Sequence, residues 1–175
     1  MPLTIRPAKP DDIPAITEIY RHAVLHGTAT FELEPPEVAE MTQRYETLLA
    51  AGFPYLVAVL DDIVIGYAYA GPYRARPAYR FSVENSVYLA PAAQGKGAGT
   101  QLMQVLITES EKRGYRLMVA VIGDSANLAS IGVHRRTGFE MVGTLQNVGL
   151  KFGRWLDTVL MQRPLGEGSG TIPKS

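Results

Sequence analysis

The chain has 175 residues, of which 46% are hydrophobic and 19% are charged, as is typical of one soluble globular domain. Lys plus Arg equal Asp plus Glu at 17 each, so no overall field favours nucleic acid or an anionic membrane as a partner. The lack of cysteine excludes disulfides, thiolate metal sites and a cysteine nucleophile.

The sequence carries no sign of export, membrane insertion or metal binding. Its first residues lack the apolar core of a signal peptide, and no apolar run approaches the roughly 20 residues of a membrane span. His22 and His26 have the spacing of two ligands on one helix face, but no third ligand accompanies them. We therefore expect a cytoplasmic protein that binds no metal, membrane or nucleic acid.

Hydrophobic spacing predicts a first half that is rich in hairpins. The expected elements are, in chain order, a strand at 3–6, a helix through 13–23, a loop at 27–36 that carries Phe31, a helix at 37–51, and strands at 55–60, 63–70 and 81–89. Asp61 and Asp62 would join the second and third of these strands in a hairpin.

The second half alternates strands and helices before it ends in two further strands. The expected elements are a helix at 100–113, a strand at 117–122, a helix at 127–137, and strands at 139–145 and 155–161. This order predicts an α/β protein with a mixed sheet and helices on both faces. We place a single domain at 1–163 and a flexible tail at 164–175, because the last residues are rich in Gly, Ser and Pro.

Residues 86–103, SVYLAPAAQGKGAGTQLM, lead from a strand through a glycine-rich loop into a helix. A triphosphate loop requires a Ser or Thr directly after its lysine, and Lys96 has none. A dinucleotide loop requires G-x-G-x-x-G at the first β-α turn, whereas this loop reads G-x-G-x-G late in the chain. A pyrophosphate at the helix N-terminus still fits, and so does an ordinary glycine-rich turn.

Two motifs together resemble the GNAT superfamily of N-acetyltransferases. QGKGAG after VYL resembles its acyl-coenzyme A loop, and a second motif, N-x-x-S-I…G-F, matches the sequence from Asn127 to Phe139. Residues 68–88, 119–123 and 149–157 are similar to the branch that acetylates phosphinothricin, methionine sulfoximine and methionine sulfone. The resemblance implies a GNAT fold with a central mixed, mostly antiparallel twisted sheet of about 6–7 strands.

The resemblance also implies the reaction and its partners. We expect direct transfer of an acetyl group from acetyl-CoA to the amino group of such an amino acid, a role in detoxification or in herbicide and antibiotic resistance, and a homodimer. The predicted acetyl-CoA contacts are Val87, Tyr88, Leu89, Gln94, Gly95, Lys96, Gly97, Ala98, Gly99, Thr100, Asn127 and Ser130.

Glu84 is the candidate general base. On a strand with a period of two, Glu84, Ser86 and Tyr88 share one face, and a carboxylate is unusual on a strand that otherwise reads as core. Partial burial would raise its pKa and make it a better base near neutral pH. The alternative is a solvent-facing glutamate on an edge strand, and the match to the branch favours the catalytic reading.

His134 and Tyr88 are the candidate general acids. Asn127, Ser130 and His134 lie at i, i+3 and i+7, so they share one helix face. In much of the superfamily a tyrosine stands at this helix position, and here it is a histidine, as in the resembled branch. His134 is therefore open as an acid, a substrate contact or a packed histidine, and Tyr88 is its rival.

The expected substrate contacts surround Glu84 and include two arginines suited to the anionic groups of an amino acid. They are Phe31, Tyr73, Arg74, Arg76, Tyr79, Glu84, Asn85 and Ser86. Without the resemblance, Phe31 reads as a loop anchor and the arginines as a solvated loop.

Two other functions remain open from the sequence. The acceptor could be a protein N-terminus, a polyamine or an aminoglycoside, although polycationic acceptors call for an acidic cleft and the two arginines disfavour one. The domain could instead bind acyl-CoA without catalysis, which Glu84 and His134 argue against. The apolar, basic and aromatic segment at 149–157 predicts a surface that packs against a second subunit.

Overall fold

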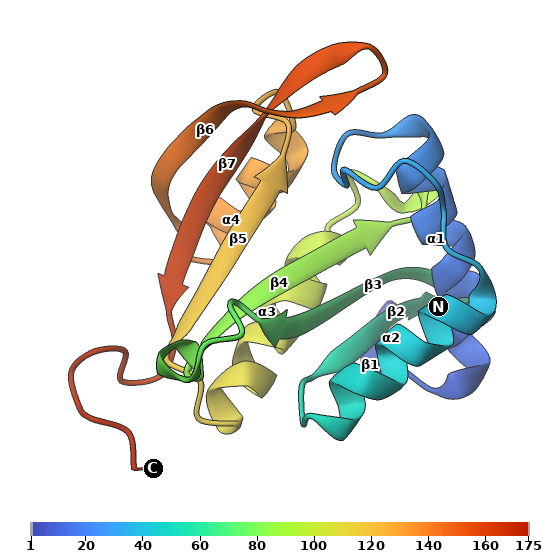
Figure 1. Cartoon of the computed structure of the whole chain (residues 1–175). Helices are drawn as coiled ribbons and strands as arrows, with labels where there is room; N and C mark the ends of the chain where they lie inside the picture. The colour runs from blue at the N-terminus through green and yellow to red at the C-terminus, as the bar shows by residue number, and fades with distance from the viewer. Residues whose placement is uncertain (1, 175) are drawn as a thin grey trace.

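The computed structural model describes residues 2–174 and contains a seven-stranded sheet flanked by helices (Figure 1). Its strands are β1 (Thr4–Pro7), β2 (Tyr55–Leu60), β3 (Ile63–Pro72), β4 (Ser82–Leu89), β5 (Leu117–Gly123), β6 (Glu140–Lys151) and β7 (Arg154–Pro164). Its α-helices are α1 (Ile13–His26), α2 (Val38–Ala50), α3 (Ala98–Lys112) and α4 (Leu128–Arg136). No helix within residues 2–174 is both long and apolar enough to cross a bilayer.

The strand order is β1-β2-β3-β4-β5-β7-β6, and every neighbouring pair is antiparallel except β4 and β5. β4 pairs with β3 along its length, up to Leu89 opposite Gly66. It pairs with β5 only at its start, where the last partners are Glu84 and Val119. Beyond this point the two strands diverge (Figure 1), so the sheet opens in its middle.

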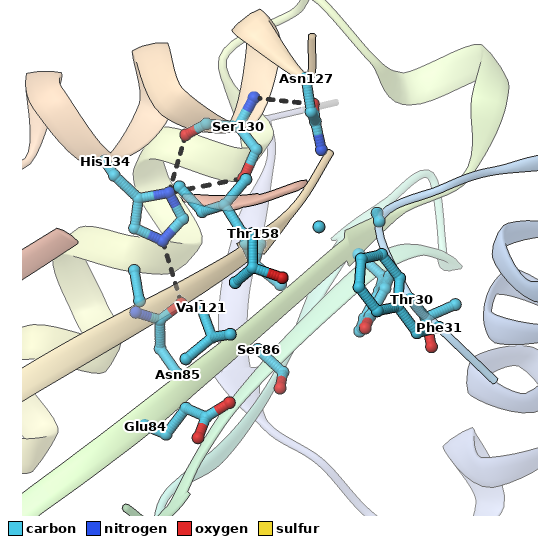
Figure 2. Close-up of a pocket in the computed structure, with 16 residues that line it drawn as sticks. Thr30, Phe31, Glu84, Asn85, Ser86, Val121, Asn127, Ser130, His134 and Thr158 are labelled. Atoms are coloured by element: carbon cyan, nitrogen blue, oxygen red, sulfur yellow. Dashed lines mark hydrogen bonds between the residues drawn. The ribbon is translucent and has the colours of Figure 1, made fainter. Parts of the chain in front are cut away.

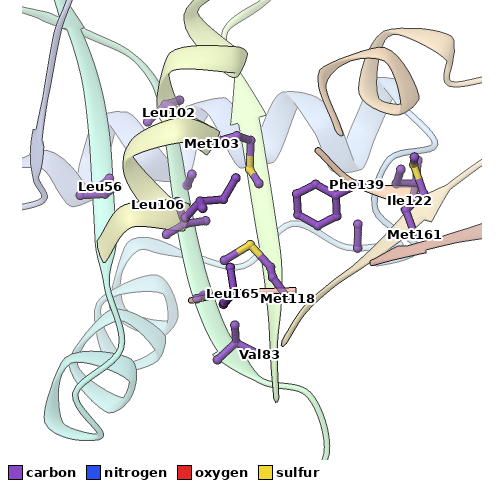
Figure 3. Packing of buried hydrophobic residues seen from close by; sticks show 14 of the residues in the cluster. Leu56, Val83, Leu102, Met103, Leu106, Met118, Ile122, Phe139, Met161 and Leu165 are labelled. Atoms are coloured by element: carbon purple, nitrogen blue, oxygen red, sulfur yellow. The ribbon is translucent and has the colours of Figure 1, made fainter. Parts of the chain in front are cut away.

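Two hydrophobic clusters lie on opposite faces of the sheet, as strand alternation requires. Leu56 and Ala58 of β2 join the cluster that includes residues of α3, whereas Tyr55 and Val57 join the cluster with residues of α1 and α2. Figure 3 shows α3 packed on the first of these clusters. The predicted mixed, mostly antiparallel sheet with helices on both faces is therefore confirmed.

The last two strands are longer than predicted and form one hairpin. β6 continues past 145 to Lys151, and β7 begins at Arg154. Between them, Phe152 and Gly153 both have positive φ, 53° and 72°, which is the turn geometry that matches strand twist. The register shifts between Leu145 and Gly149, and this irregularity breaks the alternation from which the extension could have been predicted.

The segment expected to be flexible begins inside the packed structure. Leu165 is fully buried in the α3-side cluster, and its N–H donates to the carbonyl of Arg116 at 2.9 Å. The Arg116 guanidinium also donates to the carbonyl of Gly168 and to the hydroxyl of Thr171. These contacts attach the start of the predicted tail to the domain, and the flexibility of the tail stays a prediction.

Candidate active site

A cavity of about 250 Å³ lies where β4 and β5 separate (Figure 2). The loop after α1, the two diverging strands, α4 and one residue of β7 enclose it. Its lining residues are Ala29, Thr30, Phe31, Glu84, Asn85, Ser86, Val87, Tyr88, Ala120, Val121, Ile122, Gly123, Asn127, Ser130, His134 and Thr158. The opening of the sheet thus brings together residues that are more than 100 positions apart in the chain.

Glu84 stands at the point where the pairing of β4 with β5 ends. It lines this cavity and also a second one, of about 500 Å³, on the side of α2. Burial raises the pKa of its carboxyl, and the positive charge of Arg74 partly opposes that rise. A carboxylate of this kind accepts a proton more readily than an exposed one, as a general base requires.

The second cavity lies between α2 and the strands β3 and β4. It is lined by Glu40, Gln43, Arg44, Thr47, Leu48, Tyr69, Gly71, Pro72, Glu84 and Ser86. Arg44 is fixed there by ion pairs of its Nη2 with Glu32 and Glu40, at 2.8 and 2.6 Å. Since Glu84 and Ser86 line both cavities, the two spaces meet on this face of β4.

His134 lies beneath the cavity and is only 2% exposed. Its Nδ1 lies 2.7 Å from the carbonyl oxygen of Ser130, and its Nε2 lies 3.0 Å from Oδ1 of Asn85 (Figure 2). The ring also packs edge to face on Phe139. Burial lowers the pKa of this imidazole, whereas the bond to the Ser130 carbonyl raises it.

Asn85 has protein partners for both ends of its side chain. Besides the contact with His134, its Nδ2 donates to the main-chain carbonyl of Val119 at 3.3 Å. The residue is 7% exposed, although it lines the cavity. A direct substrate contact by Asn85 stays a prediction, and it would have to compete with these two bonds.

Tyr88 extends from β4 into a cluster of tyrosines. Its ring lies 5.1 Å from that of Tyr20 and 5.5 Å from that of Tyr67. Burial raises the pKa of the Tyr88 hydroxyl well above its ordinary value. The group therefore stays protonated throughout the neutral range and can act as a hydrogen donor.

The glycine-rich loop has the backbone shape of an anion site. Gly95 and Gly97 have φ of 74° and 85°, and a Cβ added to either would meet no atom within 4 Å. Gly97 directly precedes α3, whose first turn receives no bond from a capping side chain. Main-chain N–H groups and the helix dipole thus face open space, which suits a pyrophosphate.

The other predicted acetyl-CoA contacts lie next to this loop. Gln94 and Lys96 are exposed, Ala98 and Gly99 are buried, and Thr100 is partly buried. Val87 and Leu89 pack on the α3-side cluster, while the β4 main chain here lacks pairing with β5. Asn127 caps α4, because its Oδ1 accepts the N–H of Ser130 at 3.2 Å.

Phe31 lines the cavity from the loop after α1. A Cβ at Gly149 would come within 2.5 Å of its ring, so only glycine in β6 allows the ring this position. Tyr73, Arg74, Arg76 and Tyr79 precede β4 and line neither cavity. Of these four, only Arg74 is linked to Glu84, through its effect on the pKa of that carboxyl.

Sequence reasoning missed the residues that hold the loop after α1 in place. Lys151 is 3% exposed, and its ammonium donates to the carbonyl of Thr30 at 2.8 Å. The hydroxyl of Thr28 donates to Asp124 at 2.8 Å. These contacts join segments about 100 positions apart, and no local spacing signals them. Gly123 and Thr158, neighbours across β5 and β7, were missed for the same reason.

Among residues 2–174, no group of three or more His, Asp or Glu side chains is arranged to hold a metal ion.

The sequence is similar to those of known acetyltransferases. The model of the acetyltransferase (GNAT) family matches residues 16–139. A phosphinothricin N-acetyltransferase of Alcaligenes faecalis is 53% identical over 171 residues, which are 98% of this chain and 87% of that protein. An L-methionine sulfoximine/L-methionine sulfone acetyltransferase of Salmonella typhimurium is 44% identical, over 94% of this chain and 96% of that protein.

The fold is also similar to that of a solved structure. The crystal structure of a phosphinothricin acetyltransferase from Sinorhizobium meliloti in complex with AcCoA matches with a TM-score of 0.97 and 50% sequence identity. The match covers 100% of this chain and 95% of that one.

Proposed function

The chain belongs to the GNAT family of acetyltransferases, and from this premise we propose that it transfers the acetyl group of acetyl-CoA to the amino group of a small amino acid. Phosphinothricin, methionine sulfoximine and methionine sulfone are the proposed acceptors, since relatives at 44–53% identity carry these names. The observation that carries the proposal is the position of Glu84 at the opening of the sheet, where both cavities meet.

The residues around the opened sheet suit acetyl-CoA. We assign its pyrophosphate to the loop at Gly95 and Gly97 and to the uncapped start of α3. We assign its pantetheine arm to the main chain of Val87, Tyr88 and Leu89, beyond the last pair with β5. When bound there, acetyl-CoA supplies an activated acyl group and a thiolate leaving group.

Groups of the chain itself deprotonate the amine and polarise the acetyl carbonyl. Glu84 takes the proton of the acceptor ammonium, and its raised pKa suits this role near neutral pH. The N–H of Leu89 polarises the carbonyl under attack. With no cysteine in the chain, no thioester forms on the protein, and the amine attacks directly.

We assign the donation of a proton to the leaving thiolate to Tyr88 first and to His134 second. The Tyr88 hydroxyl stays protonated because burial raises its pKa. Both ring nitrogens of His134 are already in contact with protein atoms. Replacing Tyr88 by Phe is expected to reduce kcat more than His134→Gln does, and the reverse order would give His134 the role of the acid.

For the acceptor, we propose that Phe31 covers the reacting end and that the loop before β4 reads the anionic end. Phe31 lines the cavity, and Arg74 acts electrostatically on Glu84. Arg76, Tyr73 and Tyr79 belong to the same exposed loop, and their contact with substrate requires its anionic groups to extend out of the cavity. Ser86 lines both cavities beside Glu84.

One observation favours a second class of acceptor. The second cavity extends away from Glu84 along α2, and its charged lining groups are Glu40, Glu84 and Arg44. Since Glu32 and Glu40 already neutralise Arg44, the charge there is negative overall. A longer amine, such as a polyamine or a peptide N-terminus, would find room and acidic partners in this direction.

A panel of acceptors separates these possibilities. Release of free thiol from acetyl-CoA is measured with phosphinothricin, methionine sulfoximine, methionine sulfone, a polyamine and a short peptide, and kcat/KM values are compared. The highest value is expected for one of the three amino acids. A preference for the polyamine or peptide would move the function to the second class, and no thiol release with any acceptor would leave only acyl-CoA binding.

We also propose that the protein is a cytoplasmic homodimer with a role in detoxification or resistance. The β6–β7 hairpin exposes Val148, Leu150, Phe152 and Trp155, each by more than half, and such a surface suits burial against a second copy. Light scattering at micromolar concentration is expected to give the dimer mass, and Trp155→Arg is expected to give a monomer. A wild-type monomer would contradict the assembly.

A further inference from the structure

The hydrogen bonds around His134 are sensitive to its protonation state. A main-chain carbonyl only accepts, so Nδ1, at 2.7 Å from the Ser130 oxygen, must carry a proton. The Asn85 Oδ1 is also a pure acceptor, so in this orientation of the amide the contact at 3.0 Å is a hydrogen bond only when Nε2 carries a proton as well. With the Asn85 Nδ2 donating to the Val119 carbonyl, the arrangement is fully satisfied only when the ring is an imidazolium.

A neutral ring leaves one of these contacts unmet. If Nδ1 keeps its proton, the lone pair of Nε2 faces the lone pairs of the Asn85 Oδ1. Turning the amide over repairs this contact, because Nδ2 can donate to Nε2. The same turn places Oδ1 against the carbonyl oxygen of Val119, so two acceptors then face each other.

The other tautomer of the neutral ring is no better. With the proton on Nε2, the lone pair of Nδ1 would face the Ser130 carbonyl at 2.7 Å. The hydroxyl of Ser130, at 3.5 Å from Nδ1, is too distant to compensate for this repulsion. Each neutral form therefore satisfies fewer groups than the imidazolium does, while burial opposes the charge of the imidazolium.

The amide of Asn85 also links the two strands that form the cleft. Its bond to Val119 comes directly after the last main-chain pair, Glu84 with Val119. The side chain thus adds one cross-link at the apex of the opening, on β4 beside the proposed base. When this amide changes its orientation, the cross-link between β4 and β5 at the apex of the opening is therefore lost.

Among residues 2–174, no charged side chain is a cause of the pKa shift of His134, and the Arg163 guanidinium nearby bonds the Thr137 carbonyl at 2.9 Å. On α4 the neighbouring Arg135 and Arg136 are exposed, while His134 is buried. On β4 the adjacent Glu84 belongs to the opposite face of the strand, and Arg74 is its electrostatic partner. After α4, Phe139 packs its ring on the imidazole.

We propose that Asn85 is a positioning residue that holds the ring proton of His134, and that its amide turns away from Val119 when His134 becomes neutral. This inference rests on the proposed function in one respect only, namely that the point where β4 and β5 separate takes part in acetyl transfer. His134 then acts through Asn85, by setting the spacing of β4 and β5 beside Glu84, without touching the substrate.

The test is an NMR titration of the histidine rings, which requires no activity. The chain has three histidines, and His22 and His26 are on α1 and do not line the cavity, so both serve as internal references. In Asn85→Leu the acceptor for Nε2 is lost, and we expect the proton affinity of His134 to fall about tenfold. In the isosteric Asn85→Asp the added negative charge is expected to raise that affinity by about tenfold or more.

The two variants keep the proposal falsifiable even if Asn85→Leu does not fold, since Asn85→Asp preserves the shape of the side chain. Opposite shifts at His134, with His22 and His26 unchanged, would support the proposal. If the His134 titration in Asn85→Asp coincides with that of the wild type, the proposal is overturned.

Kinetics then connect the amide to the reaction. If kcat/KM of Asn85→Asp shifts its pH profile in the direction of the His134 titration, the apex is part of acetyl transfer. If the His134 titration shifts but the pH profile of kcat/KM does not, Asn85 holds the ring proton of His134 without any part in acetyl transfer. An inactive wild type would contradict the proposed function and leave the titration result intact.

Discussion

The two halves of β4 both read as one strand in the sequence, but one half is part of the core and the other lines the cavity. Val83 and Glu84 pair with both neighbouring strands, and Val83 is fully buried in the core. Residues 85–89 pair with β3 alone, and most of them line the cavity. The difference lies in the partner strand: where β5 leaves, main-chain donors and polar side chains are freed to meet a ligand.

Glu84 and His134 stand on either side of this boundary and respond to the same cause. Burial raises the pKa of Glu84 from its ordinary value of 4.5 and lowers that of His134 from 6.5. Each shift disfavours the charged form, and the two move toward each other. At the opening of the sheet, a carboxyl that keeps a proton more readily than usual thus lies near an imidazole that keeps one less readily.

The largest effect is expected at the boundary itself. Glu84→Gln keeps the shape of the side chain but removes the proton acceptor, so kcat is expected to fall by about 10²–10⁴-fold. The affinity for acetyl-CoA, measured by calorimetry, should change little, because the loop proposed to hold its pyrophosphate, at Gly95 and Gly97, lines neither cavity beside Glu84.

Glu140→Gln, an exposed position at the start of β6, is the matched control and should retain wild-type kcat. An unchanged kcat in Glu84→Gln would remove Glu84 from the mechanism.

A substitution in the half of β4 that pairs on both sides should lower the stability of the protein and leave kcat unchanged. Val83→Ala removes two methyl groups from a fully buried site and is expected to lower the free energy of unfolding by about 2 kcal/mol. Denaturant unfolding measures this loss, and kcat per folded molecule should stay at the wild-type value. A large fall in kcat with unchanged stability would contradict the division of the strand.

The glycine-rich loop should show a smaller, mixed effect. Gly97 has a φ of 85°, so Gly97→Ala forces an alanine into the left-handed region and is expected to cost about 1–2 kcal/mol. Because the N–H groups of the cradle shift with it, KM for acetyl-CoA should rise more than kcat falls.

Gly143→Ala is the control, since an added Cβ there meets no atom within 4 Å and its φ is not positive. Equal effects of Gly97→Ala and Gly143→Ala on KM would argue against a pyrophosphate site in the glycine-rich loop.

Most of this arrangement could be predicted from the sequence, but the separation of β4 from β5 could not. Strand and helix periods are local, so the elements, the loop at Gly95 and Gly97 and the position of Glu84 on β4 could be predicted. The separation of β4 from β5 depends on which strands pair, and local spacing does not encode pairing. The bond of Lys151 to Thr30 and the approach of Gly149 to Phe31 span more than 100 residues, so they appear only in the folded chain.

The smallest expected effect separates two arginines that look alike in the sequence. Arg74 opposes the rise in the pKa of Glu84, so in Arg74→Gln that pKa should move further upward. Because the base must be deprotonated, the acid limb of kcat/KM, which we expect above pH 4.5, would shift to still higher pH. Arg74 is exposed and screened, so we expect this shift to be small.

Arg76→Gln is the matched control, because Arg76 is not among the groups that act on the Glu84 carboxyl. Its loss can weaken the binding of an anionic acceptor, yet the acid limb should stay where it is in the wild type. Equal shifts in both variants would mean that the loop acts through its total charge, and the specific link from Arg74 to the unpaired half of β4 would be lost.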